Sequence, residues 1–275
     1  MFYKEGKLMR IPDLVFKNMG EKPLILRSLS IVKEKLETGS RIKNSGTTII
    51  ALHYKDGVLM AGDRRTTFGD VHTDEAIKIE EVQNDTIIGC AGMVSFIQDL
   101  KETLLHVITR LENVVETPIY IDGQAAILKS ILKANFDFYG WIYAVPILAG
   151  YHPKKKQSFV FEFDEAGAMY KKIDYATTGS GGQLAWGVLK DRWKLGLKEK
   201  EALELAMRAL MLASFDNYSS HPFVSPSTIM VVSKKYGVLS MKEEKSLNMA
   251  YSIFREYLER HGKSKELKIF HKGDE

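Results

Sequence analysis

A threonine hydroxyl at a composition boundary is the first group in this sequence that could do chemistry. Gly46, Thr47 and Thr48 stand where a polar stretch gives way to a run of β-forming residues. A threonine hydroxyl reacts poorly until a base accepts its proton, and a free α-amino group, with a reference pKa of about 7.7 to 8.0, is a suitable base. Cleavage of the Gly46–Thr47 peptide bond would create that base beside the hydroxyl. The junction therefore fits an N-terminal nucleophile that stays inactive until a leader is removed.

Other catalytic motifs are missing from the sequence. It contains no phosphate-binding loop, zinc-ligand spacing, dinucleotide fingerprint or nucleophile elbow. Cys90 is the only cysteine, which excludes an intramolecular disulfide, and its apolar neighbours indicate a thiol buried in the core. By itself, the run from Gly46 to Thr48 also fits the ordinary start of a β-strand, so the choice depends on the surrounding sequence.

The elements expected around this junction are antiparallel strands and pairs of helices. Residues 47–54 and 58–62 predict a hairpin closed by Asp56 and Gly57. Hydrophobic periodicity predicts further strands and helices, with strands at 76–82, 86–91, 143–151, 158–164, 168–175, 228–233 and 238–241, and helices at 95–115, 123–138, 183–192, 198–214 and 242–260. Because no βαβ alternation dominates this order, we expect an α+β fold with helix pairs packed outside antiparallel sheets.

Residues 1–46 differ from the rest of the chain in charge and pattern. They hold ten Lys or Arg and five Asp or Glu, a net charge of +5, so the whole-chain charge of +4 leaves −1 for the remainder. A short helix is expected at 26–36, followed by a polar hinge at 38–46. We therefore expect a removable leader at 1–46 and one catalytic domain at 47–275.

Composition excludes several classes of protein. Among the 275 residues, 45% are hydrophobic and 27% charged, unlike a disordered chain or a coiled coil. The longest apolar run, 141–151, is too short to span a membrane and contains Pro146, and no secretory signal is evident. The main domain is not basic and has no basic helix interleaved with aromatic residues, which argues against nucleic-acid binding. We expect a cytoplasmic protein with no membrane association.

Several motifs in order resemble one known family. Residues 47–63 read TTIIALHYKDGVLMAGD, and Ala91-Gly92, the stretch PILAGY at 146–151 and the run at 179–181 follow, with the likeness reaching about Met241. Together they resemble the mature β subunits of 20S proteasomes, above all the bacterial subunits of the actinobacterial kind. The resemblance implies an αββα sandwich of the N-terminal nucleophile hydrolase class and the activity of a threonine-type endopeptidase.

The resemblance also assigns roles to individual residues. Thr47 matches the nucleophile, Asp63 an acid, and Lys78 the lysine between them. A protonated lysine beside the threonine oxygen would favour the alkoxide, while the carboxylate would hold the ammonium in place. Gly92 matches the glycine whose backbone N–H receives the developing oxyanion. Without this context, Asp63 and Lys78 would be interpreted as an ordinary strand-edge ion pair and Gly92 as a turn glycine.

A second set of residues matches groups that support catalysis and specificity in the family. Ser180, Asp216 and Ser219 match hydroxyl and carboxylate groups around the amine of the nucleophile, although Ser220 and Gly182 depart from the usual pattern beside them. The specificity pocket is matched by Thr66, Ala76, Glu80, Cys90, Val94 and Gln98. Small and apolar members predominate, which favours an apolar substrate side chain, whereas a Glu80 turned inward would favour a basic one.

Partners are implied by the same resemblance. They are other β subunits in a ring expected to be heptameric, proteasome α-subunit rings, an ATP-dependent unfoldase and unfolded protein substrates, with no cofactor and no metal. Three alternatives stay open: a smaller dodecameric bacterial threonine peptidase of the same superfamily, a catalytically silent ring subunit, and an amidase acting on a small metabolite. Chain length, the leader and Arg64-Arg65 argue against the first, and the presence of Thr47, Asp63 and Lys78 argues against the second.

Overall fold

The computed structural model describes residues 2–4, 7–9, 46–68, 71–140, 143–216 and 219–261. The helix expected at 26–36 lies outside the described residues. Among the described helices, none combines the length and apolar character needed to cross a membrane.

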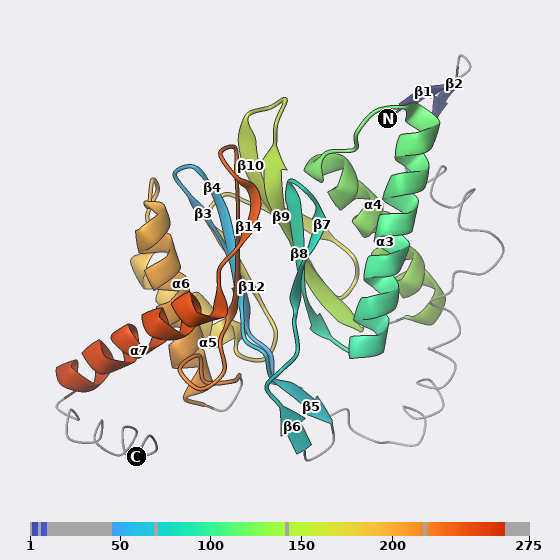
Figure 1. Ribbon diagram of the computed structural model, residues 1–275. Coiled ribbons are helices and arrows are strands. Elements are labelled where there is room, and N and C mark those ends of the chain that lie inside the picture. Colours follow the sequence, from blue (N-terminus) through green and yellow to red (C-terminus); the bar gives the residue numbers. More distant parts are fainter. Residues whose placement is uncertain are drawn as a thin grey trace.

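Two five-stranded antiparallel sheets form the centre of the fold (Figure 1). The strands of the first sheet are, in order, β12 (Tyr175–Thr178), β3 (Ile49–Tyr54), β4 (Gly57–Gly62), β13 (Thr228–Ser233) and β14 (Gly237–Ser240). Those of the second are β11 (Met169–Lys172), β10 (Gln157–Phe163), β9 (Ala144–His152), β8 (Thr86–Gly92) and β7 (Ile79–Gln83). Two small hairpins stand apart, formed by β1 (Phe2–Lys4) with β2 (Lys7–Met9) and by β5 (Thr66–Phe68) with β6 (Val71–Thr73).

Helices cover the outer face of each sheet (Figure 1). The second sheet is covered by α3 (Val94–Val115) and α4 (Ile121–Tyr139). The first is covered by α5 (Gly182–Arg192), α6 (Glu199–Ser214) and α7 (Glu243–Arg260). The four layers confirm the predicted α+β fold and its αββα arrangement.

Both faces of β3 and β4 are buried, which explains their nearly continuous apolar sequence. Successive side chains of a strand point to opposite faces. Ile49 and Ala51 therefore pack between the sheets with Met60, whereas Ile50 and Leu52 pack against the helices of the first sheet. Burial on both faces removes the polar alternation that a half-exposed strand would show.

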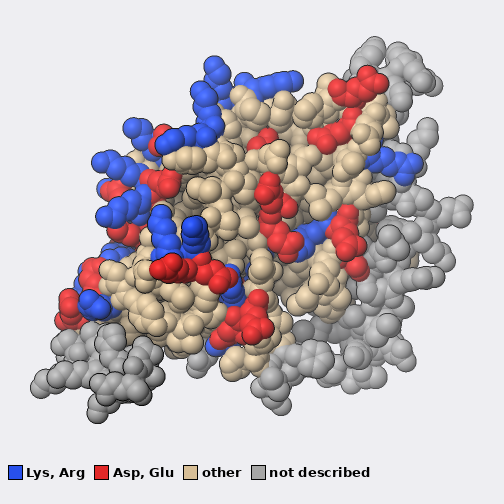
Figure 2. Space-filling view, in the orientation of Figure 1, with Lys and Arg blue, Asp and Glu red and all other residues tan. Residues whose placement is uncertain are grey.

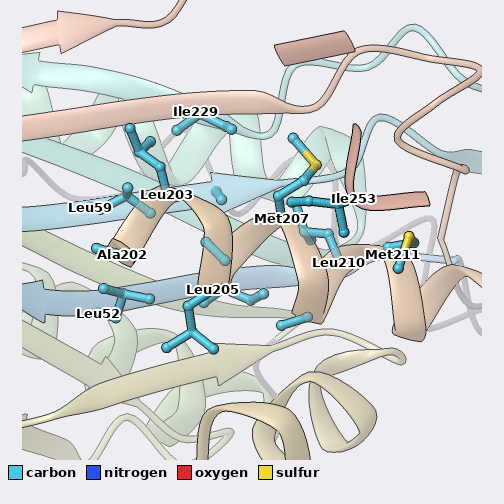
Figure 3. Close-up of a cluster of buried hydrophobic side chains, with 14 of the residues drawn as sticks. Leu52, Leu59, Ala202, Leu203, Leu205, Met207, Leu210, Met211, Ile229 and Ile253 are labelled. Atoms are coloured by element: carbon cyan, nitrogen blue, oxygen red, sulfur yellow. The ribbon is translucent and has the colours of Figure 1, made fainter. Parts of the chain in front are cut away.

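Helix α6 supplies much of the core on the outer side of the first sheet. Figure 3 shows Leu203, Met207 and Leu210 of this helix close to Leu59 of β4 and Ile253 of α7. The helix is rich in Ala, Leu and Met, which have high helix propensity, and ten of its residues are buried. This packing fixes the sheet whose β3 begins two residues after Thr47.

Three details of the predicted elements differ from the structure. The single strand expected at 168–175 is two strands, because β11 pairs with β10 in one sheet and β12 with β3 in the other. The strand expected at 76–82 begins only at Ile79, because the backbone before it is hydrogen-bonded to two separate segments. The Ala76 N–H donates to the Arg64 carbonyl, and the Lys78 carbonyl accepts from the Cys90 N–H. Neither small hairpin, β1–β2 or β5–β6, was predicted.

We expect the packing of α3 against the second sheet to contribute strongly to stability. Leu100 of α3 is fully buried, so Leu100→Ala should lower the free energy of unfolding by about 2 to 5 kcal/mol, through lost burial and the cavity left behind. Leu195 is 88% exposed and provides the matched control, for which Leu195→Ala should change the value by less than about 0.5 kcal/mol. Urea unfolding measures both, and equal losses would contradict the assigned packing.

Candidate active site

Thr47 lies just before β3 and is held by the turn that follows β12. Its N–H donates to Ser180 Oγ over 3.1 Å, and its carbonyl accepts from the Gly181 N–H over 3.0 Å. Gly179 has a φ of +89°, and a Cβ there would meet the Thr47 carbonyl oxygen at 2.3 Å. The turn can therefore approach Thr47 this closely only with glycine at 179.

Lys78 joins the three groups at the centre of the site. Its ammonium nitrogen lies 2.8 Å from Asp63 Oδ1, 3.0 Å from Thr47 Oγ1 and 3.1 Å from the Gly46 carbonyl oxygen. A lysine ammonium has three N–H donors, so these three acceptors use its full capacity. The structure thus brings Thr47, Asp63 and Lys78 together as the sequence predicts, and includes the bond expected to be cleaved.

Asp63 is fixed by backbone donors as well as by Lys78. Oδ1 also accepts from the Thr48 N–H over 2.7 Å, while Oδ2 accepts from the N–H groups of Arg65 over 2.8 Å and Ser220 over 3.1 Å. The side chain is 1% exposed. Hydrogen bonds to a charged group are stronger than neutral ones, so this carboxylate is a rigid, negatively charged anchor for the ammonium.

Burial sets the protonation behaviour of Lys78. Removal from water lowers the pKa of Lys78 below its ordinary value, and the neighbouring Asp63 carboxylate opposes that effect. Asp74 also acts to raise the pKa of Lys78, whereas Arg65 acts to lower it. Lys78 therefore releases its proton at lower pH than an exposed lysine would.

Gly92, the predicted oxyanion donor, ends β8 on the strand that adjoins Lys78. Two residues earlier, the Cys90 N–H donates to the Lys78 carbonyl over 3.3 Å. Gly92 has a φ of +138°, and a Cβ would meet the Tyr143 carbonyl oxygen at 2.0 Å. The backbone requires glycine at this position, while the oxyanion role stays a prediction.

The predicted supporting residues are placed unequally. Ser180 contacts Thr47 directly, whereas Ser219 is fully buried and its Oγ has no hydrogen-bond partner among the described residues. Asp216 is exposed just after α6, and no hydrogen bond or ion pair in the described part of the chain joins it to Thr47.

The sequence analysis did not predict the backbone donors around Asp63, because every residue except proline has a backbone N–H and residue type does not show which of them will bind a carboxylate. It also treated Ser220 only as a departure from the family pattern. In the structure the Ser220 hydroxyl accepts from the Arg64 N–H over 3.1 Å, while its own N–H binds Asp63. The departure itself was the signal that could have identified this residue.

Two predicted pocket residues face the α3 side of the second sheet. Cys90 is buried in the core cluster beneath α3 and α4, and burial raises the pKa of its thiol to about 12. The thiol is therefore neutral and unreactive, as the sequence indicated. Glu80 forms an ion pair with Lys101 of α3, so its charge is compensated rather than free to attract a basic side chain.

The other four pocket residues come from two places. Thr66 pairs with Thr73 in the β5–β6 hairpin, and the Ala76 N–H donates to the Arg64 carbonyl over 3.0 Å. Val94 and Gln98 are exposed one turn apart near the start of α3. Their joint role as a specificity pocket stays a prediction.

Among the described residues, no group of three or more His, Cys, Asp or Glu side chains converges as metal ligands would.

We expect Lys78 to matter for stability as well as chemistry. Lys78→Met would leave the buried Asp63 carboxylate without its ammonium partner, which should cost about 3 to 5 kcal/mol of unfolding free energy. Lys133→Met removes an exposed pair with Asp137 and should cost less than about 1 kcal/mol. Urea unfolding of both variants is the measurement, and a Lys78 loss no larger than the Lys133 loss would contradict the buried pair.

Comparison with known proteins identifies the family. The sequence profile of the family described as "Proteasome subunit" matches residues 43–225. "Proteasome subunit beta 1" of Streptomyces avermitilis is 29% identical over 218 residues, covering 77% of both chains. "Proteasome subunit beta" of Jonesia denitrificans is 31% identical over 62% of this chain and 58% of the relative, and that of Acidimicrobium ferrooxidans is 31% identical over 62% and 63%.

The matched region includes every residue of the central site. Thr47, Asp63 and Lys78 all lie within the residues that the family profile covers, as do Gly92 and Ser180. The four-layer fold and this match agree with the resemblance found in the sequence. The chain therefore belongs to the proteasome subunit family and resembles the bacterial beta subunits within it.

Proposed function

We propose that this protein is a catalytic proteasome β subunit, a threonine-type endopeptidase that cleaves unfolded proteins. Its nucleophile is Thr47, exposed as the N-terminal residue after removal of residues 1–46 as a propeptide, and residues 47–275 form the catalytic domain. It works in the cytoplasm in a ring of β subunits, expected to be heptameric, stacked on α-subunit rings and fed by an ATP-dependent unfoldase. The relatives named proteasome subunit beta support this assignment.

The observation that carries the proposal is the triple contact of Lys78. One ammonium group touches the nucleophile oxygen, the carbonyl oxygen of Gly46 and the anchoring carboxylate of Asp63. A fixed positive charge beside a hydroxyl favours its ionised form, and a donor on a carbonyl oxygen stabilises the negative charge that develops during attack. This arrangement suits both removal of the leader and later cleavage of substrates.

Leader removal is an intramolecular acyl transfer. Thr47 Oγ attacks the carbonyl carbon of Gly46, the Gly46–Thr47 C–N bond breaks, and the proton of the hydroxyl passes to the released nitrogen. Water then hydrolyses the resulting ester, which leaves a carboxylate on Gly46 and a free α-amine on Thr47. Holding reacting groups in place can supply about 7 to 11 kcal/mol of the barrier, so ring assembly, which fixes the junction further, is the expected trigger.

Substrate cleavage repeats this chemistry with the new amine as the base. The α-amine accepts the hydroxyl proton, Thr47 Oγ attacks the substrate carbonyl, and the Gly92 N–H stabilises the oxyanion. The amine then protonates the departing peptide nitrogen, and water releases the acyl group. Ser180, whose hydroxyl already contacts the Thr47 nitrogen, positions that amine.

The first test removes the nucleophile. Thr47→Ala should assemble but show no hydrolysis of fluorogenic peptides and should keep its leader, because it lacks the attacking oxygen. Thr47→Ser keeps an oxygen in the same position and should retain measurable activity and processing. Peptide assays and intact-mass measurement of both particles provide the readouts, and an active Thr47→Ala particle would overturn the proposal. A processed wild type without peptidase activity would instead favour a silent ring subunit.

The second test is the pH dependence of kcat/KM. Activity should rise as the α-amine deprotonates, around its reference pKa of about 7.7 to 8.0. It should fall again as Lys78 loses its proton, and because burial lowers the pKa of Lys78, this fall should begin below the range of an exposed lysine. A bell-shaped profile with a neutral to mildly alkaline maximum is expected, whereas control by one group titrating near pH 4 would point to a carboxylate base.

A further inference from the structure

The chain between Asp63 and Lys78 forms the β5–β6 hairpin, which lies outside the two large sheets. Asp63 follows β4 directly, and Lys78 immediately precedes β7, so the hairpin separates the two charged groups that must meet. The hairpin also reaches the expected cleavage junction, where the Gly46 N–H donates to Thr67 Oγ1 over 3.3 Å. Its base lies toward the bottom of Figure 1, at the lower end of the two sheets.

We propose that Asp74 is a positioning residue of this site, which closes the base of the hairpin on Arg65 and thereby fixes Lys78 against Asp63 and Thr47. This inference rests on the proposed catalytic role of Lys78 and adds a residue that neither the sequence motifs nor the family resemblance singled out.

Asp74 and Arg65 form a two-pronged ion pair across the hairpin base. Arg65 Nε donates to Asp74 Oδ1 over 2.9 Å, and Nη2 donates to Oδ2 over 3.1 Å. The two side chains are 26% and 12% exposed. Paired parallel hydrogen bonds between a guanidinium and a carboxylate define geometry as well as energy, so this contact fixes the two sides of the base relative to each other.

The pair is tied to Asp63 on one side and to a neighbouring loop on the other. The Arg65 N–H donates to Asp63 Oδ2 over 2.8 Å, so its side chain and backbone link Asp74 to the anchor carboxylate. The Asp74 carbonyl accepts from Ser225 Oγ over 2.7 Å, in the same loop whose Ser220 N–H binds Asp63. Asp74 is thus the point where the hairpin and the loop are joined.

Arg64 is anchored elsewhere, which makes the Asp74 contact specific to Arg65. Its Nε donates to Thr228 Oγ1 over 3.3 Å, and Nη2 lies 2.6 Å from Glu243 Oε1 of α7. The two adjacent arginines therefore hold the segment after Asp63 through different contacts. Arg64 binds β13 and α7, and Arg65 binds the base of the hairpin.

The two partners of this ion pair act on the pKa of Lys78 in opposite directions. Asp74 acts to raise the pKa of Lys78 and Arg65 acts to lower it, after the larger effects of burial and of Asp63. Loss of either partner alone would break the same contact, while the change in charge by itself would move the titration of Lys78 in opposite directions. Removing both partners leaves the net charge near Lys78 unchanged, so a shift that remains in the double variant reports how firmly Lys78 is held against Asp63.

Several other titratable side chains lie close to this pair in the described part of the chain, including the exposed Glu75 next to Asp74. Glu80 on the adjoining strand is paired with Lys101, and burial keeps the Cys90 thiol neutral by raising its pKa to about 12. His221 faces the same ion pair, but burial, reinforced by Arg65, lowers the pKa of His221 below its ordinary value. Its titration therefore falls well to the acidic side of that of Lys78.

The experiment compares Asp74→Asn, Arg65→Met and the double variant in the full chain. Carbon and nitrogen NMR of lysine-labelled protein reports the titration of Lys78, whose signals are assigned by their loss in Lys78→Met. We expect the Lys78 titration to move to lower pH in Asp74→Asn, where the lost negative charge and the looser contact with Asp63 act together. In the double variant the titration should stay below the wild-type position, because Lys78 is held less firmly against Asp63. In Arg65→Met the two effects oppose each other, so its titration should lie above that of Asp74→Asn.

Kinetics on the assembled particle provide the second readout. Because Lys78 is less firmly placed, kcat/KM at the pH maximum should fall about 10-fold to 100-fold in all three variants, and the alkaline fall should follow the NMR shifts in the single variants. Glu256→Gln, which breaks a comparable ion pair with Arg208 between α6 and α7, is the matched control and should change neither the titration nor the alkaline fall.

Several outcomes would overturn the inference. They are an unchanged Lys78 titration in Asp74→Asn, a wild-type titration in the double variant, or wild-type kcat/KM in Asp74→Asn. If a single variant fails to fold, Ser225→Ala removes only the hydroxyl bond to Asp74 and should still lower kcat/KM, so full activity would count against the inference. If the double variant shows the lowered Lys78 titration but the wild type shows no Thr47-dependent hydrolysis, the result would support the role of Asp74 and contradict the proposed function instead.

Discussion

An ammonium ion taken out of water costs several kcal/mol unless charged and polar partners replace its hydration. In this protein the buried ion is the ammonium group of Lys78. The carboxylate of Asp63, 2.8 Å away, is the charged partner that offsets its lost hydration. Asp63 can serve because three backbone N–H groups hold it in place. Those donors come from the start of β3, the hairpin base and the 219–225 loop, so the charge pair constrains segments that are far apart in the sequence.

The surrounding fold is arranged to meet that constraint. The two sheets bury apolar side chains between them, and helices cover both outer faces (Figure 1). Thr47 lies just before β3 of the first sheet and Lys78 just before β7 of the second, so the site joins the two sheets. On the face in Figure 2, acidic and basic side chains are intermixed over the helices, while much of the surface carries no charge. The charge on this face is therefore mixed in sign, in line with the net charge of −1 for the residues after 46.

The sequence predicted most elements because their patterns are local. Hairpin β3–β4, helix pair α3–α4 and the closing helix α7 follow from turn residues and hydrophobic periodicity. Thr47, Asp63 and Lys78 were found because family motifs mark them, and the structure brings them together. The donors to Asp63, the contact of Asp74 with Arg65 and the split of residues 168–175 depend on pairing across long sequence separations, which no local pattern records.

The central claim is that Thr47 becomes an N-terminal nucleophile. A peptide that ends in an α,β-epoxyketone tests it most directly. The Thr47 hydroxyl adds to the ketone and the α-amine opens the epoxide, so both bonds form only when the amine is free. Mass spectrometry of the treated particle should locate one adduct per processed subunit on a peptide beginning at Thr47. An adduct on another residue, or a particle that is active yet unmodified at Thr47, would contradict the account.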